Sequence, residues 1–112
     1  MIKNKLVRDS MIKIIENDGY VPKFKIIKGN QLKAALRYKL VEEANEVLVS
    51  KTKQNLLEEL ADTYQALIDL TKESGFSMKD LTTEVNRKFK DRGGFRKGVF
   101  LINVTTRNWF SE

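Results

Sequence analysis

The chain has 112 residues, with 21 lysines and arginines against 15 aspartates and glutamates, and it contains neither cysteine nor histidine. The lack of these two residue types excludes disulfides, thiolate or imidazole metal ligands and a histidine general base, so a bound metal would have oxygen ligands and be a hard cation such as Mg²⁺ or Mn²⁺. The net charge of +6 favours polyanionic partners, which include nucleic acid, anionic lipid and nucleotide phosphates.

The length and ordinary composition predict one domain covering residues 1–112. No stretch is apolar for long enough to span a membrane, and the sequence MIKNKLVRDS lacks the apolar segment of a signal peptide. We therefore expect a cytoplasmic protein without a membrane partner.

The N-terminal half predicts a short helix, an extended segment and a long helix. Apolar residues at helical spacing follow Ser10, and Gly19 lies where this first helix should stop. Residues 23–28, KFKIIK, are rich in β-forming residues and predict a short strand. Asn30 is suited to cap the next helix, which the apolar pattern predicts from about residue 31 to residue 50.

The C-terminal half predicts two further helices and a second extended segment. The apolar residues of a helix over residues 56–73 cover roughly 200° of its circumference, so we expect it to be central in a bundle or covered by another subunit. Ser77 and Asp80 resemble a capping box that opens a third long helix, and the DRGGF sequence ends it. Residues 99–104 are β-branched and apolar and predict a strand. The sequence thus predicts a mainly all-α fold, a helical bundle of about four helices, with short extended segments near residues 23–28 and 99–104 that could pair.

Acidic residues occur where the first long helix should be apolar. On a helical wheel with 100° per residue and Leu36 at 0°, Glu43 lies at about −20°, inside the apolar stripe. Glu46 lies at about −80°, at the border of the stripe. Glu42 lies at about −120° on the same wheel, which fits a side chain in contact with solvent. A lone buried carboxylate costs several kcal/mol, so Glu43 should be protonated, paired or bound to a cation.

The second long helix repeats this pattern with Glu59 inside the apolar arc and Asp62 at its edge. Two acids three residues apart share a helix face, so two such helices side by side would bring four carboxylates together, a grouping that divalent cations stabilise. The alternative is that all these acids are solvated surface residues, which is the usual role of charged runs and fits Glu58 well.

The third long helix carries cations that could bind the phosphates of a substrate held at these acids. Lys88 shares the phase of Leu81, and Arg92 follows one turn later, which fits a pair of phosphate-binding cations. The alternative is that their stems cover the core while their charged ends reach water. Lys39 borders the acids of the first long helix and is either a further phosphate contact or an ion-pair partner.

The order of these motifs resembles a known family. EEANE followed after twelve residues by ELAD is similar to the EExxE…ExxD signature of the all-α nucleoside triphosphate pyrophosphohydrolases, the MazG and phosphoribosyl-ATP pyrophosphohydrolase-like superfamily. VNRKFKDR resembles a downstream segment of that superfamily, and NKLVRDSMIKIIENDG and RGGFRKG resemble a short single-domain branch of it.

The resemblance implies an active homodimer or dimer of dimers that uses Mg²⁺ to cleave a nucleoside triphosphate between its α- and β-phosphates, releasing pyrophosphate. The N- and C-terminal additions are unlike those of the histidine-biosynthetic enzyme, which favours general nucleotide-pool house-cleaning and leaves open whether the substrate is phosphoribosyl-ATP or an NTP or dNTP. The implied metal ligands are the second and last acids of the first motif and both acids of the second: Glu43, Glu46, Glu59 and Asp62. Glu43 or Glu46 would accept the proton of the attacking water. The implied phosphate contacts are Lys39, Asn86, Lys88 and Arg92.

Two other functions remain open at this stage. A basic helical module would bind nucleic acid through its lysine and arginine excess and would have no use for inward-facing acids. A catalytically silent relative would keep the fold and bind a nucleotide with Mg²⁺ without hydrolysing it.

Overall fold

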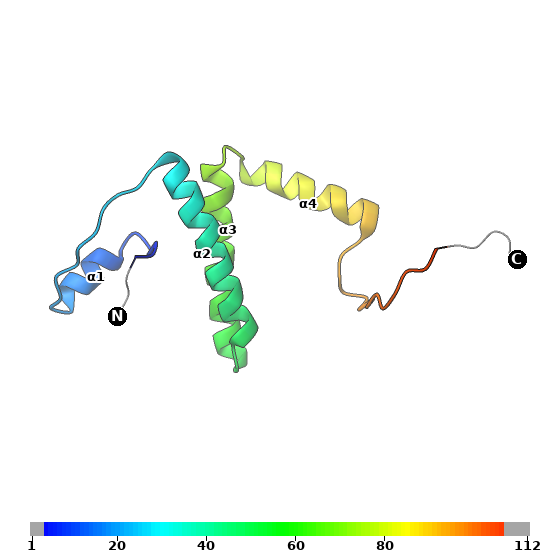
Figure 1. The fold of residues 1–112 in the computed structure, drawn as a ribbon, viewed down its shortest axis with the longest axis horizontal. Helices are drawn as coiled ribbons and strands as arrows, with labels where there is room; N and C mark the ends of the chain where they lie inside the picture. The colour runs from blue at the N-terminus through cyan, green and yellow to red at the C-terminus, as the bar shows by residue number, and fades with distance from the viewer. Residues whose placement is uncertain (1–3, 107–112) are drawn as a thin grey trace, which may run out of the picture. The chain divides into compact units, whose positions relative to one another are not determined.

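The computed structural model describes residues 4–106, and these contain four helices and no β-strand (Figure 1). The helices are α1 (Met11–Asn17), α2 (Gly29–Val49), α3 (Lys53–Glu73) and α4 (Met78–Arg92). The prediction of an all-α fold with about four helices is therefore confirmed. None of the described helices is both long and apolar enough to cross a membrane.

The chain divides into two compact units, Met1–Leu81 and Thr82–Glu112. The first unit holds α1, α2, α3 and the beginning of α4, whereas the second holds the remainder of α4 and the residues that follow it. Whether residues 1–112 act as one domain stays a prediction.

The first unit is organised around an antiparallel hairpin of α2 and α3, which lie side by side in Figure 1. Leu36 on α2 and Ala66 on α3 are its buried hydrophobic residues. Two helical turns separate Leu36 from Glu43, and two turns also separate Glu59 from Ala66, so an antiparallel pair brings the two acids to the same level. The hairpin thereby aligns the acidic motifs of the two helices.

Local capping signals fix where α3 and α4 begin. The Thr52 hydroxyl accepts a hydrogen bond from the Asn55 amide at 3.0 Å, which starts α3 three residues before the predicted position. The predicted capping box is present, because the Asp80 amide donates to Ser77 Oγ at 3.0 Å and the Ser77 amide donates to Asp80 Oδ2 at 2.9 Å. Gly75, with φ of +89°, ends α3 as predicted.

Three local predictions are wrong: two strands and one helix cap. Residues 23–28 and 99–104 are not strands, because a strand needs a partner for its backbone hydrogen bonds and no strand pairing occurs among residues 4–106. Asn30 is not a cap, because α2 already begins at Gly29, where the Leu32 amide donates to the Lys28 carbonyl at 3.4 Å. Asn30 therefore lies inside the helix.

The hairpin leaves a broad apolar face uncovered in the first unit. Leu57, Leu60 and Tyr64 on α3 are 61%, 48% and 57% exposed. Their spacing of three and four residues places them on one face of α3. The predicted apolar arc thus exists, and α2 covers only part of it.

Candidate metal centre

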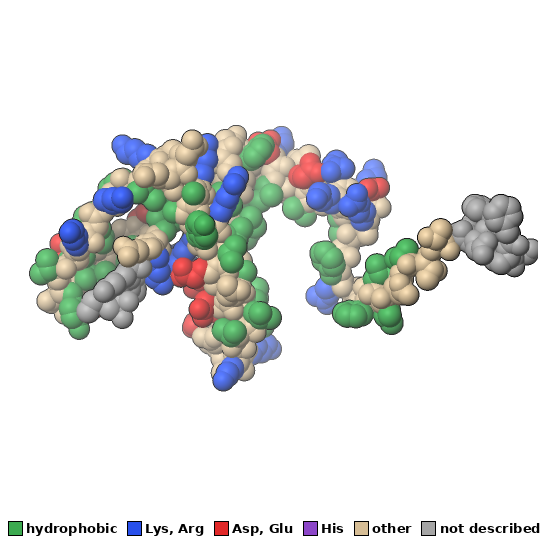
Figure 2. Space-filling model, viewed as in Figure 1, with side chains coloured by type: hydrophobic (Ala, Val, Ile, Leu, Met, Phe, Trp, Pro, Cys, Tyr) green, Lys and Arg blue, Asp and Glu red, His purple; other side chains and the backbone are tan. Residues whose placement is uncertain are grey.

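Three carboxylates from the two hairpin helices converge midway along the hairpin. Glu43 on α2 and Glu59 and Asp62 on α3 each offer one oxygen, and all three oxygens lie within 4.8 Å of one another. Figure 2 shows acidic side chains gathered on this part of the α2–α3 pair, with cationic side chains next to them. We refer to Glu43, Glu59 and Asp62 as the three-acid cluster.

The burial of the acids follows their helical phase. Glu43 is buried, with 8% of its surface exposed, as its position in the apolar stripe predicts. Glu59 and Asp62 are half-buried, whereas Glu46 is exposed and lies outside the three-acid cluster. The structure therefore brings together three of the four acids that the sequence selects.

The charge of Glu43 is balanced by a lysine from its own helix. Lys39 Nζ lies 3.0 Å from Glu43 Oε1 and 3.2 Å from Glu42 Oε1, one turn along α2. Partial burial on its own lowers the pKa of Lys39, but the bonds to Glu43 and Glu42 outweigh it and raise the pKa above 10.5. Lys39 is therefore a permanent cation beside the cluster.

Glu42 is held by two lysines instead of facing solvent alone. Lys5 Nζ lies 3.1 Å from the same Glu42 Oε1 that Lys39 contacts. Partial burial raises the pKa of Glu42, but the hydrogen bonds from Lys5 and Lys39 lower it by more. The net pKa therefore lies below 4.5. Glu42 connects the residues before α1 to the hairpin.

A second cation from the residues before α1 reaches the cluster itself. Arg8 Nη2 lies 2.5 Å from Asp62 Oδ1, and the two residues are 54 positions apart in the sequence. The side chains of Arg8 and Asp62 are 56% and 38% exposed, so water screens the pair.

Glu59 carries the uncompensated charge of the cluster. No cation among residues 4–106 forms an ion pair with it within 4.0 Å. Partial burial raises the pKa of Glu59 above 4.5, and the negative charges of Asp62, Glu43 and Glu46 raise it further. A positive charge placed among the three acids would remove this repulsion.

The three-acid cluster fits a hard divalent cation. Oxygen ligands bound to Mg²⁺ at about 2.1 Å lie about 3 to 4 Å apart, so carboxylate oxygens within 4.8 Å need only a small rotation to share one ion. Thiolate and imidazole ligands are absent from the whole sequence, so the carboxylates of the site favour oxygen-preferring ions.

The same part of the chain carries a family signature. Residues 23–89, more than half of the chain, match the family model of phosphoribosyl-ATP pyrophosphohydrolase. The chain belongs to the phosphoribosyl-ATP pyrophosphohydrolase family. Comparison with curated proteins and with solved structures gave no match. Membership supports a function of the nucleotide pyrophosphohydrolase kind, the hydrolysis of a phosphoric anhydride bond.

The span that matches the phosphoribosyl-ATP pyrophosphohydrolase family includes all of α2 and α3 and continues to Phe89 in α4. It therefore contains the whole three-acid cluster together with Glu46. The recognised family pattern and the convergence of the acids in space concern the same residues.

The predicted phosphate contacts on α4 belong to the second unit. Asn86, Lys88 and Arg92 are all exposed on this helix. Arg92 Nε lies 3.6 Å from Asp91 Oδ2, a loose pair of exposed groups. The three-acid cluster lies in the first unit, so the role of these three residues in phosphate binding stays a prediction.

Lys5 and Arg8 contact acids of the hairpin, at Glu42 and Asp62. The sequence alone does not identify either of these two cations as a site residue. Both precede Lys23, so they lie outside the span that matches the phosphoribosyl-ATP pyrophosphohydrolase family. No spacing rule links Arg8 to an acid 54 residues later, because that contact depends on how the residues before α1 return to the hairpin.

Proposed function

We propose that the chain is a Mg²⁺-dependent nucleoside triphosphate pyrophosphohydrolase, with Mn²⁺ as an alternative ion. It would convert an NTP or dNTP to the nucleoside monophosphate and pyrophosphate, as nucleotide-pool house-cleaning requires. The observation that supports this most strongly is the convergence of Glu43, Glu59 and Asp62 within the span that matches the family.

Glu43, Glu59 and Asp62 would hold the divalent cation. When bound, such an ion supplies positive charge to the phosphate oxygens and makes a water molecule more acidic. Lys39 pairs with Glu43 at 3.0 Å, so this buried ligand has a counter-charge beside it before a cation binds.

Glu46 is the better placed of the two proposed proton acceptors. Glu43 is buried, and one of its carboxylate oxygens already contacts Lys39, so it is the less accessible of the two to a water molecule. Glu46 is exposed on the same face of α2 and has no ion pair among the described residues, yet its charge acts on Glu59. We propose that Glu46 accepts the proton of the attacking water, while the three-acid cluster would hold the divalent cation that the triphosphate phosphates need.

Lys88 and Arg92, with Lys39 and Asn86, remain the proposed phosphate-binding residues. Cations that contact the phosphates would stabilise the negative charge that builds on the departing pyrophosphate.

The activity can be tested with a panel of canonical, deoxy and damaged nucleoside triphosphates and phosphoribosyl-ATP. We expect pyrophosphate release from at least one triphosphate with Mg²⁺ and none with a chelator. The monophosphate product should be identified in parallel, since release of single phosphate would indicate another cleavage position. Binding of a triphosphate without turnover would identify a catalytically silent relative and contradict the enzyme proposal.

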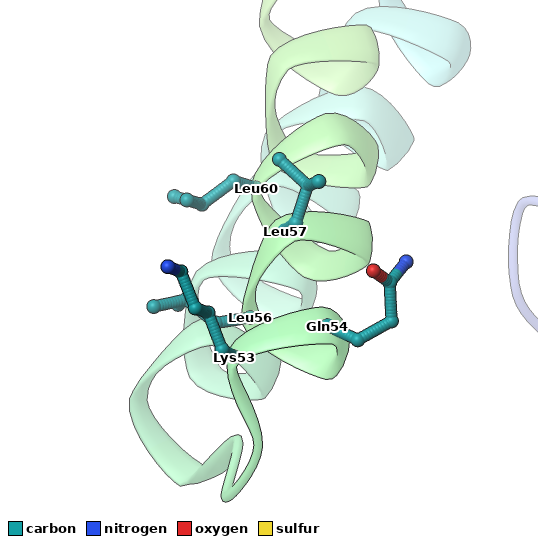
Figure 3. Close-up of a pocket in the computed structure, with 5 residues that line it drawn as sticks. All are labelled: Lys53, Gln54, Leu56, Leu57 and Leu60. Carbon is teal, nitrogen blue, oxygen red and sulfur yellow. The ribbon is translucent and has the colours of Figure 1, made fainter.

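We also propose that the chain forms a homodimer or a dimer of dimers through the uncovered face of α3. An open hollow lies at the N-terminal end of this helix, lined by Lys53, Gln54, Leu56, Leu57 and Leu60 (Figure 3). Exposed leucines at this density cost free energy in water, and a second copy of the same helix would cover them.

Replacing Leu60 with glutamate should therefore weaken self-association at least about 30-fold, which corresponds to about 2 kcal/mol. Sedimentation over a range of concentrations measures this, with Gln31→Glu as a control that adds the same charge at an exposed position of α2. A wild-type protein that is monomeric at all concentrations, or a Leu60→Glu variant that associates like wild type, would contradict the proposal.

A further inference from the structure

The residues before α1 place two cations against the acids of the hairpin. Lys5 contacts Glu42 at 3.1 Å and Arg8 contacts Asp62 at 2.5 Å. These are the ion pairs within the described residues that join the first ten residues to α2 and α3. One of the two acids, Asp62, belongs to the three-acid cluster.

The Arg8–Asp62 pair is poorly suited to a purely structural role. Both side chains are more than a third exposed, and exposed pairs of this kind contribute about 0 to 1 kcal/mol to stability. Such a pair exchanges partners at little cost. A guanidinium has five N–H donors, and the contact with Asp62 occupies only one nitrogen of Arg8, so most of these donors can bind another anion.

A triphosphate held at the three-acid cluster would bring new anions next to Arg8. If Glu43, Glu59 and Asp62 hold the cation, the phosphates that bind to it would lie near Asp62, whose carboxylate accepts a hydrogen bond from Arg8. Binding of the ion would also engage the Asp62 charge that Arg8 now neutralises. A guanidinium released in this way forms bidentate hydrogen bonds with phosphate.

We infer that Arg8 is a further substrate-binding residue, which moves from Asp62 to the polyphosphate when a nucleoside triphosphate binds with its divalent cation. This inference rests on the proposed function. Lys5 and Lys39, which share Glu42 Oε1, extend the cationic border of the site beyond Arg8. Arg8 lies outside residues 23–89, so the contact would be supplied by the part of this chain that the family match does not cover.

The test compares Arg8→Ala and Arg8→Lys with wild type, and Lys13→Ala serves as the matched control. Lys13 is an exposed cation on α1 and forms no ion pair among residues 4–106. Arg8→Ala should raise KM and weaken calorimetric binding of a non-hydrolysable triphosphate analogue about 10-fold or more in the presence of Mg²⁺. Arg8→Lys should recover part of this loss, and Lys13→Ala should match wild type.

Binding of Mn²⁺ without nucleotide, followed by electron paramagnetic resonance, separates substrate binding from structural support of Asp62. Arg8→Ala should bind Mn²⁺ as tightly as wild type or more tightly, because a competing cation is gone. Weaker Mn²⁺ binding with unchanged analogue affinity would overturn the inference, as would an Arg8→Ala variant that matches Lys13→Ala in every measurement. A wild-type protein that binds no triphosphate would overturn the proposed function as well, whereas normal wild-type binding with no effect of Arg8 would overturn this inference alone.

Discussion

Replacing Glu59 with glutamine should reduce Mg²⁺-dependent pyrophosphate release by at least about 100-fold while the protein stays folded. Glu59 is the member of the three-acid cluster without a cation partner among the described residues, so its charge is the one most available to a metal ion. Glutamine keeps the shape of the side chain and removes that charge. Steady-state kinetics and a Mg²⁺ titration of the thermal midpoint measure both consequences.

The neighbouring residue supplies the control for this experiment. Glu58 is exposed and accepts a hydrogen bond from Gln54 Nε2 at 3.4 Å on its own helix, so Glu58→Gln removes the same charge outside the cluster. We expect near-normal activity and a normal Mg²⁺ response from Glu58→Gln. A folded Glu59→Gln variant with wild-type activity would show that the cluster does not hold the catalytic ion.

Glu59→Gln should also remove a pH dependence of the free energy of unfolding. Because the pKa of Glu59 in the folded state is raised above 4.5, protonation of this residue favours folding. Its stabilising contribution is complete below the unfolded-state pKa and is lost as the pH rises through the folded-state pKa. Without divalent ions, Glu59→Gln should therefore be as stable as wild type or more stable at neutral pH, since the repulsion from Asp62 and Glu43 is gone.

Local signals predicted most of the fold, and the cap expected at Asn30 is the local signal that failed. The capping box of Ser77 and Asp80, the stop at Gly75 and the apolar spacing of the long helices depend on residues a few positions apart, and the structure contains all of them. Strand predictions fail because a β-rich run such as residues 23–28 becomes a strand only with a partner, which local composition does not provide.

The candidate site shows the same division between local and distant information. Helical phase predicted that Glu43 would be buried, and the hairpin register then placed it beside Glu59 and Asp62. Glu46 lies at the edge of the apolar stripe, so helical phase alone does not predict whether it is buried. In the structure it is exposed. The contact of Arg8 with Asp62 was not predictable, because it depends on the path of the chain before α1.

Replacing Lys39 with methionine should destabilise the metal-free protein by about 3 kcal/mol, because the nearly buried Glu43 loses its counter-charge. Only 19% of the Lys39 side chain and 11% of the Glu43 side chain are exposed, so water compensates little of the loss. Urea unfolding in the presence of a chelator measures the change. Lys5→Met is the matched control and should cost less than about 1 kcal/mol, since Glu42 keeps Lys39 and both Lys5 and Glu42 are more than a third exposed.

Mg²⁺ should restore much of the stability of Lys39→Met, because the ion and the lysine both neutralise Glu43. The variant should therefore respond to Mg²⁺ more strongly than wild type, whose Glu43 is already paired. In wild type the lysine would hold the acids together until the ion arrives and would then be free to contact a phosphate. If Lys39→Met were destabilised equally with and without Mg²⁺, Lys39 would support packing alone, and Glu43 would not be a ligand of the ion.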